Sequence, residues 1–143
     1  MKKLILLSAF LIIACSSGGD SDNNEIGNLE YLGTYRGNID VFLNGTYHST
    51  LNNHQMTFVS IQNSNQVNII GNLIMTSNCT FDQDGFVIPE TIPVTTELFY
   101  ALEYGSGILN GNSLEIELYQ DQINSTTGNV QGTGFWTGTL EKI

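Results

Sequence analysis

The feature that most constrains the fold is an alternation of apolar and polar residues that recurs from residue 31 to residue 143. In the first such segment one face carries Tyr31, Gly33, Tyr35, Gly37, Ile39, Val41 and Leu43, and the other carries Thr34, Arg36, Asn38 and Asp40. A period of two residues is typical of a β-strand with one buried face. Because no helical or coiled-coil repeat accompanies this pattern, the sequence predicts an all-β fold.

Asparagine and glycine residues divide the pattern into segments that tight turns can join. Asn44-Gly45 offers two residues that tolerate positive φ, as a type I′ hairpin turn requires, and Asn110-Gly111 offers a second Asn-Gly turn. Strands are expected over residues 31–43, 46–50, 55–62, 67–75, 98–109, 114–118 and 130–143, with one short strand and a long loop between 77 and 93. About eight strands with short connections predict a small antiparallel up-and-down β-barrel.

The first and last strands share a second pattern, in which glycines flank a central aromatic residue on one face. It occurs in Gly33-Thr34-Tyr35-Arg36-Gly37 and again in Gly134-Phe135-Trp136-Thr137-Gly138. An aromatic ring over glycine backbone shields that backbone from water and lets a strongly curved sheet pack. We therefore expect these two strands to pair and close the barrel, with the Trp136 ring pointing inward.

The N-terminal residues resemble an export signal, because a basic start precedes a short apolar run. The four residues Ile12-Ile13-Ala14-Cys15 are similar to the lipobox of bacterial lipoproteins, in which the cysteine is acylated and becomes the first residue after cleavage. The expected organisation is a lipoprotein signal peptide over residues 1–14, a lipidated cysteine with a flexible tether over 15–28, and a barrel domain over 29–143. Several acyl chains on Cys15 would attach the protein stably to a membrane.

The residues that follow Cys15 indicate the membrane to which the lipid would attach the protein. Ser16 stands where an aspartate retains the lipoproteins of enteric bacteria in the inner membrane, so we expect a lipid anchor in the outer membrane. The small, polar and acidic residues of the tether also resemble the surface-export signals of Bacteroidetes lipoproteins, which favours display on the cell surface.

Three glycine-rich segments of the domain resemble the small calycin-like lipoproteins of Bacteroidetes. They are Gly33-Thr34-Tyr35-Arg36-Gly37, Gly105-Ser106-Gly107 with the following Leu109-Asn110-Gly111-Asn112-Ser113-Leu114, and Gly134-Phe135-Trp136-Thr137-Gly138-Thr139-Leu140. The likeness covers most of residues 31 to 140. It implies a lipocalin-like barrel and leaves the function open.

The charge of the chain excludes one class of partner. The sequence has four Lys and Arg residues against 14 Asp and Glu, and its formal net charge is −10. Loss of Lys2 and Lys3 with the signal would change this to −10 − 2 = −12. Because neutralising phosphates takes clustered basic side chains, no nucleic acid partner is expected.

Residues that could bind a metal are isolated in the sequence. His48 and His54 lack the cysteine or carboxylate spacing of a metal site. Asp82 and Asp84 resemble the start of a calcium loop without its later ligands. We therefore expect no metal and no cofactor.

Candidate nucleophiles and acid–base pairs are equally sparse. Cys79 is the only thiol left once Cys15 is acylated, and it is expected to be buried as a small hydrophobic residue. Glu115 and Glu117 share one strand face, but nothing marks an opposing carboxylate pair across a cleft. No enzymatic activity is therefore expected.

Two functions fit these observations. The first is a non-enzymatic surface interaction or scaffold module, whose outer face or loops contact an envelope protein or a glycan. The alternative is a lipocalin-like binder that holds a small apolar ligand inside the barrel. Its expected lining residues are Tyr35, Phe58, Ile69, Tyr100, Ile116 and Trp136. Because large side chains can fill the interior of an eight-stranded barrel, a packed core is favoured over a pocket.

Overall fold

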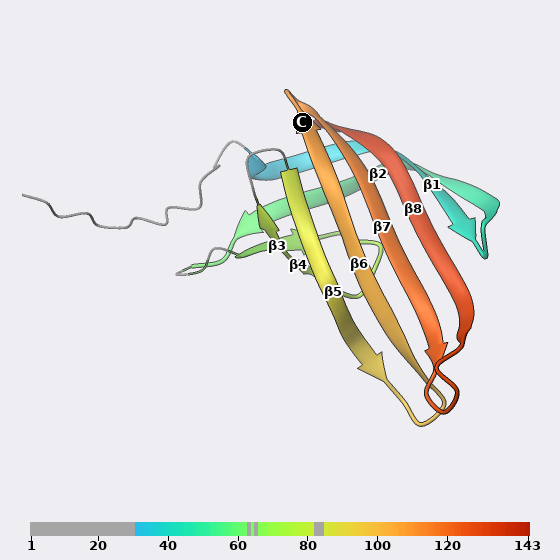
Figure 1. Cartoon of the computed structure of the whole chain (residues 1–143). Helices are drawn as coiled ribbons and strands as arrows, with labels where there is room; N and C mark the ends of the chain where they lie inside the picture. The colour runs from blue at the N-terminus through green and yellow to red at the C-terminus, as the bar shows by residue number, and fades with distance from the viewer. Residues whose placement is uncertain (1–30, 63, 65, 82–84) are drawn as a thin grey trace, which may run out of the picture.

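The computed structural model describes residues 31–62, 64, 66–81 and 85–143. These residues form one closed barrel in which each strand pairs antiparallel with its sequence neighbours and β1 pairs with β8 (Figure 1). The strands are β1 (Gly33–Leu43), β2 (Thr46–Ser60), β3 (Gln66–Ile70), β4 (Asn78–Phe81), β5 (Gly85–Thr95), β6 (Phe99–Asn110), β7 (Ser113–Asn124) and β8 (Val130–Lys142). The predicted all-β, eight-stranded, up-and-down barrel is confirmed.

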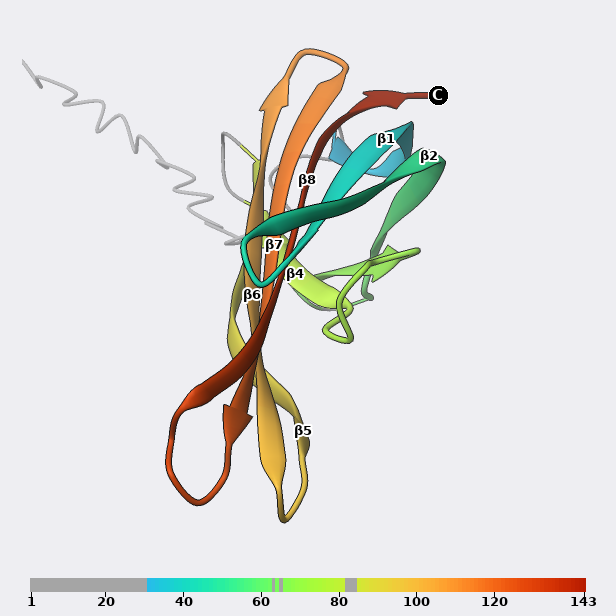
Figure 2. The ribbon, with the colours of Figure 1, turned by 90° about the vertical axis from the view of Figure 1, so that its right-hand side faces the viewer.

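The barrel has one extended side. β5 to β8 lie side by side there, and β1 and β2 cross them at a steep angle (Figure 1). Figure 2 shows the ends of the β5–β6 and β7–β8 hairpins projecting past the rest of the barrel. Hydrogen bonds of 3.1 Å from Ser125 N to Leu98 O and from Ser125 Oγ to Thr96 O join the tips of these two hairpins.

The seam between the first and last strands is continuous. Its register runs from Tyr35 opposite Lys142 to Leu43 opposite Gly134, without an interruption. This confirms that the terminal strands pair, as their matched glycine patterns predict.

Two glycines permit the close approach of backbones at this seam. A Cβ atom at Gly37 would lie 2.9 Å from the Cα of Leu140, and one at Gly138 would lie 3.0 Å from the Cα of Ile39. Such separations are too short for a side chain to be accommodated. At these positions the backbone of the opposite strand, rather than an aromatic ring, therefore requires the glycine.

Both predicted Asn-Gly segments form tight hairpin turns, with different geometry. In the turn between β1 and β2, Asn44 and Gly45 both have positive φ, at 51° and 74°, as a type I′ turn requires. In the turn between β6 and β7 only Gly111 has positive φ, at 64°. A single positive φ at the first central position matches a type II′ turn.

The strands predicted over residues 46–50 and 55–62 are one strand, β2, which ends at Ser60. The polar residues between them form a bulge, where Asn53 has a φ of 55° and its N–H donates to Asn38 Oδ1 at 3.1 Å. The register with β1 shifts at the same place, between Gly37 and Ile39. Asparagine tolerates the positive φ that a type I′ turn requires and that Asn53 adopts in this bulge.

The region from residue 67 to residue 95 also differs from the prediction. β3 ends at Ile70, and Gly71, with a φ of 80°, directs the chain out of the sheet. Two strands, β4 and β5, replace the single short strand and long loop expected between 77 and 93. β5 contains both prolines, Pro89 and Pro93, each beside a register shift with β6. Prolines are tolerated where a ladder is already interrupted.

A packed core occupies the interior of the barrel. It consists of fourteen buried side chains: Tyr35, Ile39, Met56, Phe58, Val67, Ile69, Ile74, Cys79, Phe86, Ile88, Leu114, Ile116, Leu118 and Leu140. Rings cover glycine backbone here too, since a Cβ atom at Gly107 would overlap the ring of Phe86. Close packing of this kind leaves little room for a ligand.

One carboxylate lies within this apolar surrounding and is matched by hydrogen-bond donors. Glu103 is fully buried, and residues 71–77, which we call the inner segment, fold over it. It accepts hydrogen bonds from Thr76 N at 2.7 Å, Thr76 Oγ1 at 2.8 Å and Met75 N at 3.1 Å, and one from Gln120 Nε2 at 2.5 Å. Because a buried carboxylate is costly without partners, Glu103 fastens the inner segment to β6 and β7.

Candidate functional site

Five of the six residues expected to line a barrel pocket come together in the interior. Tyr35, Phe58, Ile69 and Ile116 belong to the buried core, and Trp136 is half-buried and packs against it. The rings of Tyr35 and Phe58 contact each other edge to face, with centroids 5.7 Å apart. These side chains therefore pack on one another.

Tyr100 lies apart from the other five, which corrects its expected inward placement. Along β6 the inward residues are Ala101, Glu103, Gly105 and Gly107, so Tyr100 is on the outer face. Three of these four inward residues are small, and core side chains fill the space above the two glycines, as the Phe86 ring does above Gly107. Apolar alternation alone does not tell which face of such a strand is buried.

Trp136 has the orientation that the sequence predicts. A Cβ atom at Gly134 would lie 2.5 Å from the Trp136 ring, so the ring lies over the glycine on the inner face of β8. It covers the core at the end of the barrel near the β1–β2 turn.

The outer face carries a row of five aromatic side chains from five adjacent strands. In order across the sheet these are Tyr47 on β2, Phe42 on β1, Phe135 on β8, Tyr119 on β7 and Tyr104 on β6. Successive members are directly opposite one another in the strand registers, and their ring centroids are 5.8, 5.7, 4.7 and 4.9 Å apart. We call this set the aromatic row.

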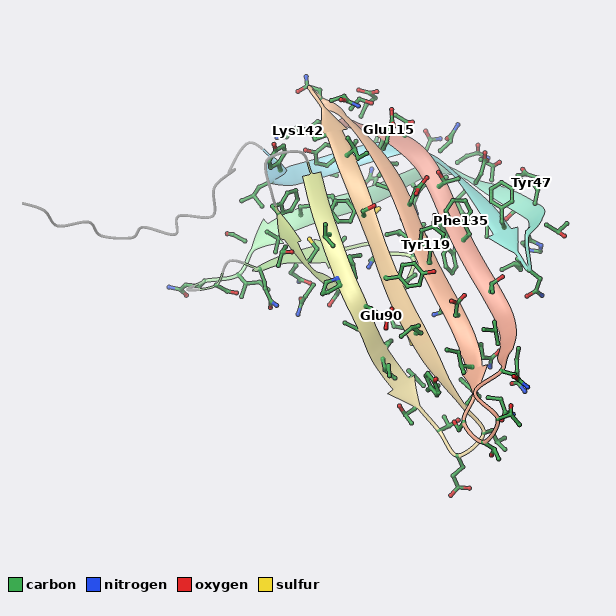
Figure 3. The ribbon with its side chains drawn as sticks, viewed as in Figure 1. Tyr47, Glu90, Glu115, Tyr119, Phe135 and Lys142 are labelled. Carbon is green, nitrogen blue, oxygen red and sulfur yellow. The ribbon has the colours of Figure 1, made fainter. Side chains whose placement is uncertain are left out.

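Three rings of the aromatic row stack face to face, whereas Phe42 contacts Phe135 at a tilt of 35° and Tyr47 edge to face. Tyr104 and Tyr119 are parallel within 10°, and Tyr119 and Phe135 within 26°. Parallel rings at this separation overlap in an offset stack, which leaves their edges to solvent. Tyr47, at one end, is 55% exposed, and Figure 3 shows Tyr119 and Phe135 side by side on the outer surface.

Carboxylates lie beside Tyr104 and Tyr119, at one end of the aromatic row, and make the potential there negative. Burial raises the pKa of Tyr104, and the charges of Asp121 and Glu90 raise it further. Burial also raises the pKa of Tyr119, which donates a hydrogen bond of 3.2 Å to Glu117 Oε2. The negative potential at the row therefore comes from carboxylates on β5 and β7.

The basic side chains of the described region lie at the other end of the strands. Arg36 is opposite Glu141, and Lys142 lies over the ring of Tyr35 at 5.8 Å from its centroid. Phe42 is six residues from Arg36 along β1, or about 20 Å. The aromatic row is thus acidic without a neighbouring compensating cation among residues 31–62, 64, 66–81 and 85–143.

A shallow hollow of about 230 Å³ lies beside the aromatic row on the outer face of β6, β7 and β8. Its lining residues are mostly polar or small: Ser106, Gly107, Ile108, Glu115, Ile116, Glu117, Thr137, Gly138 and Thr139. Glu115 and Glu117 are exposed there, as their alternation with apolar residues predicts. The hollow and the aromatic row together form one continuous surface.

The two histidines lie apart from any group of metal-ligating side chains in the part of the chain that is described. His48 is exposed, and His54 Nε2 lies 2.7 Å from Gly71 O. No group of three His, Cys, Asp or Glu side chains among the described residues could hold a metal ion. Asp82 and Asp84 lie outside the described residues.

Cys79 is buried in the core, and this burial raises the pKa of its thiol from 9.0 to about 12. The unfolded thiol ionises near pH 9, so the stability that depends on the neutral thiol is complete below that pH and is lost as the pH rises toward 12. We expect the free energy of unfolding to decrease by about 1 kcal/mol per pH unit in this range. Urea unfolding at a series of pH values measures the slope.

A Cys79→Ala variant provides the control for this slope. Tyr104 and Tyr119 also have raised pKa values and act in the same direction, so the variant should retain a smaller slope. Equal slopes for the variant and the original chain would show that Cys79 is not responsible.

Sequence reasoning missed two features, one on the outer face and one in the core. The aromatic row was not recognised, because its members are far apart in the sequence and meet only through the strand registers. An available signal was the position of Phe42, Tyr119 and Phe135 on the same strand faces as polar residues. Glu103 was missed as well, although it interrupts an aromatic-rich strand between Leu102 and Tyr104.

Comparisons with known proteins found no matching family model, curated protein or solved structure. None of the described residues belongs to a helix with the length and hydropathy of a membrane span.

Proposed function

We propose that this protein is a non-enzymatic interaction module of the cell envelope, and that it contacts a macromolecular partner through the aromatic row. The observation that carries the proposal is the row itself, in which five rings from five adjacent strands are placed on the outer face. The outer face of a barrel in water is ordinarily polar, and contiguous exposed apolar surface is typical of interaction sites. Aromatic residues also contribute strongly to binding at protein interfaces.

The packing of the interior supports this function over the alternative of an apolar ligand inside the barrel. Tyr35, Phe58, Ile69 and Ile116, which a ligand would have to contact, are at most 3% exposed and pack on one another. A ligand could enter only if this packing were disrupted. The outer face needs no such rearrangement.

The charge around the aromatic row favours a basic partner, such as a lysine- or arginine-rich segment of an envelope protein. Glu90, Glu117 and Asp121 lie around the rings and can pair with cationic side chains. Complementary charge steers association and selects against acidic partners. A glycan is less well suited, because a sugar ring stacks on an aromatic face and the facing sides of Tyr104, Tyr119 and Phe135 are already stacked on one another.

Binding of a synthetic peptide of alternating lysine and glycine tests this function by calorimetry. We expect binding that weakens with salt and that falls about tenfold when Tyr47→Ser and Tyr104→Ser are combined. These substitutions leave the charge of the protein unchanged, so a reduced affinity would report the rings themselves. Val87→Ser, at an exposed aliphatic residue of β5, is the matched control and should bind as the original chain does.

Three outcomes would contradict this proposal. If the double variant bound the lysine–glycine peptide as tightly as the original chain does, the rings would not belong to the binding site. If a serine–glycine peptide bound as tightly as the lysine–glycine peptide, recognition would not depend on the charge of the partner. Binding of neutral oligosaccharides that is lost with Tyr47→Ser and Tyr104→Ser would make the partner a glycan.

The proposed location is the outer membrane, with a lipid on Cys15 as the anchor and the surface of the cell as the favoured side. Cys15 and the tether lie outside the described residues, so the proposal rests on the lipobox-like Ile12-Ile13-Ala14-Cys15. We expect Cys15→Ser to abolish labelling with radioactive palmitate and to release the protein from the membrane fraction. Cys79→Ser, which leaves Cys15 intact, is the control and should keep the label. Labelling of Cys15→Ser at the original level would contradict the anchor.

A further inference from the structure

A second concave surface lies at the end of the barrel where β7 and β8 extend past β1. It has a volume of about 250 Å³ and lies on the inner face of these strands, on the side opposite the aromatic row. Its lining includes Trp136 and Gly132 from β8, Gln120 and Gln122 from β7, and Asn44 from the β1–β2 turn. We call it the mouth depression.

The depression is open because Gly132, the lining residue near the start of β8, has no side chain. A Cβ atom at Gly132 would meet only two atoms within 4 Å, Asn44 Oδ1 and Gln122 Oε1, each at 3.7 Å. Asn44 is held in place by two hydrogen bonds to Thr133, from Asn44 N to Thr133 O at 2.9 Å and from Thr133 N to Asn44 Oδ1 at 3.0 Å. The walls are thus fixed, and no side chain fills the space above Gly132.

The lining combines one aromatic ring with several amides and contains no charged side chain. Within the described part of the chain, neither the Trp136 Nε1–H nor the Gln122 amide makes a hydrogen bond to protein, and no buried polar side-chain atom lacks a partner. Both groups therefore reach solvent. An amide can donate and accept at once, and an indole adds one donor and an apolar surface.

We propose that the mouth depression binds a single ring of a neutral polyhydroxyl compound, a sugar. An apolar C–H face of the sugar would lie against Trp136, and adjacent hydroxyl groups would bond to the amides of Gln122 and Asn44. The volume of 250 Å³ is smaller than that of most pockets for drug-sized ligands, which suits one ring. An uncharged lining also matches a neutral ligand, because a charged one would be left unpaired.

Fluorescence of the full chain tests this site directly, because Trp136 is its only tryptophan. Glucose, galactose, mannose and N-acetylglucosamine are the probes, each as the free sugar and as its methyl glycoside. We expect a saturable change with at least one of them and a dissociation constant of about 1 mM, confirmed by calorimetry. Binding of the free sugar alone would indicate a soluble monosaccharide, whereas equal binding of the glycoside would indicate the terminal residue of a glycan.

Three variants separate specific binding from a general effect on the fluorescence. Gly132→Val places a side chain in the depression and should abolish the response, and its Cβ atom would have no neighbour closer than 3.7 Å. Gln122→Ala should weaken binding about tenfold, whereas Gln131→Ala, next to Gly132 but outside the lining, should leave it unchanged. Absence of a saturable response to all the probes, or an undiminished response in Gly132→Val, would overturn the proposal. Neither result bears on the basic peptide, whose site is on the opposite face.

Discussion

Replacement of Glu103 with leucine is expected to destabilise the protein by about 3 to 5 kcal/mol, even though leucine suits an apolar core. The carboxylate accepts hydrogen bonds from the backbone N–H groups of Met75 and Thr76 and from Gln120. These donors remain when the side chain is removed, and each one that stays buried without a partner costs about 1 to 3 kcal/mol. The inner segment would then have to leave the barrel, or its N–H groups would stay without a hydrogen-bond acceptor.

Urea unfolding measures this change, with two further variants for comparison. Glu103→Gln keeps the shape of the side chain but replaces one acceptor with an amide donor that faces other donors. Its free energy of unfolding should therefore lie between those of the original chain and Glu103→Leu, about 2 kcal/mol below the original chain. Glu115→Leu makes the same change as Glu103→Leu at an exposed position of β7 and should alter stability by less than about 0.5 kcal/mol. Stability of Glu103→Leu equal to that of the original chain would show that the inner segment is not fastened by this residue.

Substitution of Gly138 with alanine is expected to open the seam between β1 and β8. The added Cβ atom would lie 3.0 Å from the Cα of Ile39 and still closer to the carbonyl oxygen of Asn38. Backbone atoms of a paired strand cannot rotate away as a side chain can, so the two strands must separate. We expect the free energy of unfolding to decrease by about 3 kcal/mol, which is at the upper end of the range for overpacking by a small group.

Gly132→Ala is the matched control, because it makes the same change on the same face of the same strand. Its Cβ atom would have no neighbour closer than 3.7 Å. Alanine also restricts the unfolded chain, so this variant should be unchanged or more stable by about 0.5 kcal/mol. Equal effects of Gly138→Ala and Gly132→Ala would contradict the account of the seam.

The parts of the fold that sequence could predict are those determined by local chemistry. Alternation located the strands around Ile39, Ile116 and Leu140, and the residues at Asn44-Gly45 specified the first turn and its positive φ values. The matched glycines predicted the pairing of the terminal strands. Each of these signals lies within a few residues and needs no tertiary information.

The errors occurred where tertiary contacts decide between local alternatives. Asn53 suits a turn and a bulge equally well, and only pairing with β1 makes β2 continuous. Tyr100 lies on an alternating face of β6, but that face is outward because core side chains fill the space above Gly105 and Gly107. The inner segment leaves the sheet at Gly71 because Glu103, far away in the sequence, supplies its hydrogen-bond acceptor.

The candidate site could not be predicted from the sequence, and the reason is related. The aromatic row depends on four strand registers, and a shift of one residue in any of them would place a ring on the inner face or out of contact. The placement of Trp136 over Gly134 could be predicted, because the two residues lie two positions apart on one strand. Sequence alone could therefore predict one ring of the barrel end but not the outer surface.

Nuclear magnetic resonance mapping of the lysine–glycine peptide distinguishes recognition on the outer face, over a filled interior, from binding inside the barrel. We expect the aromatic signals of Tyr47, Tyr104 and Tyr119 to shift with peptide concentration. The methyl signals of Ile116 and Leu118, which lie in the core, should stay constant. Unchanged aromatic signals, together with core methyl signals that move on addition of a fatty acid, would rule out the outer face and place the binding site inside the barrel.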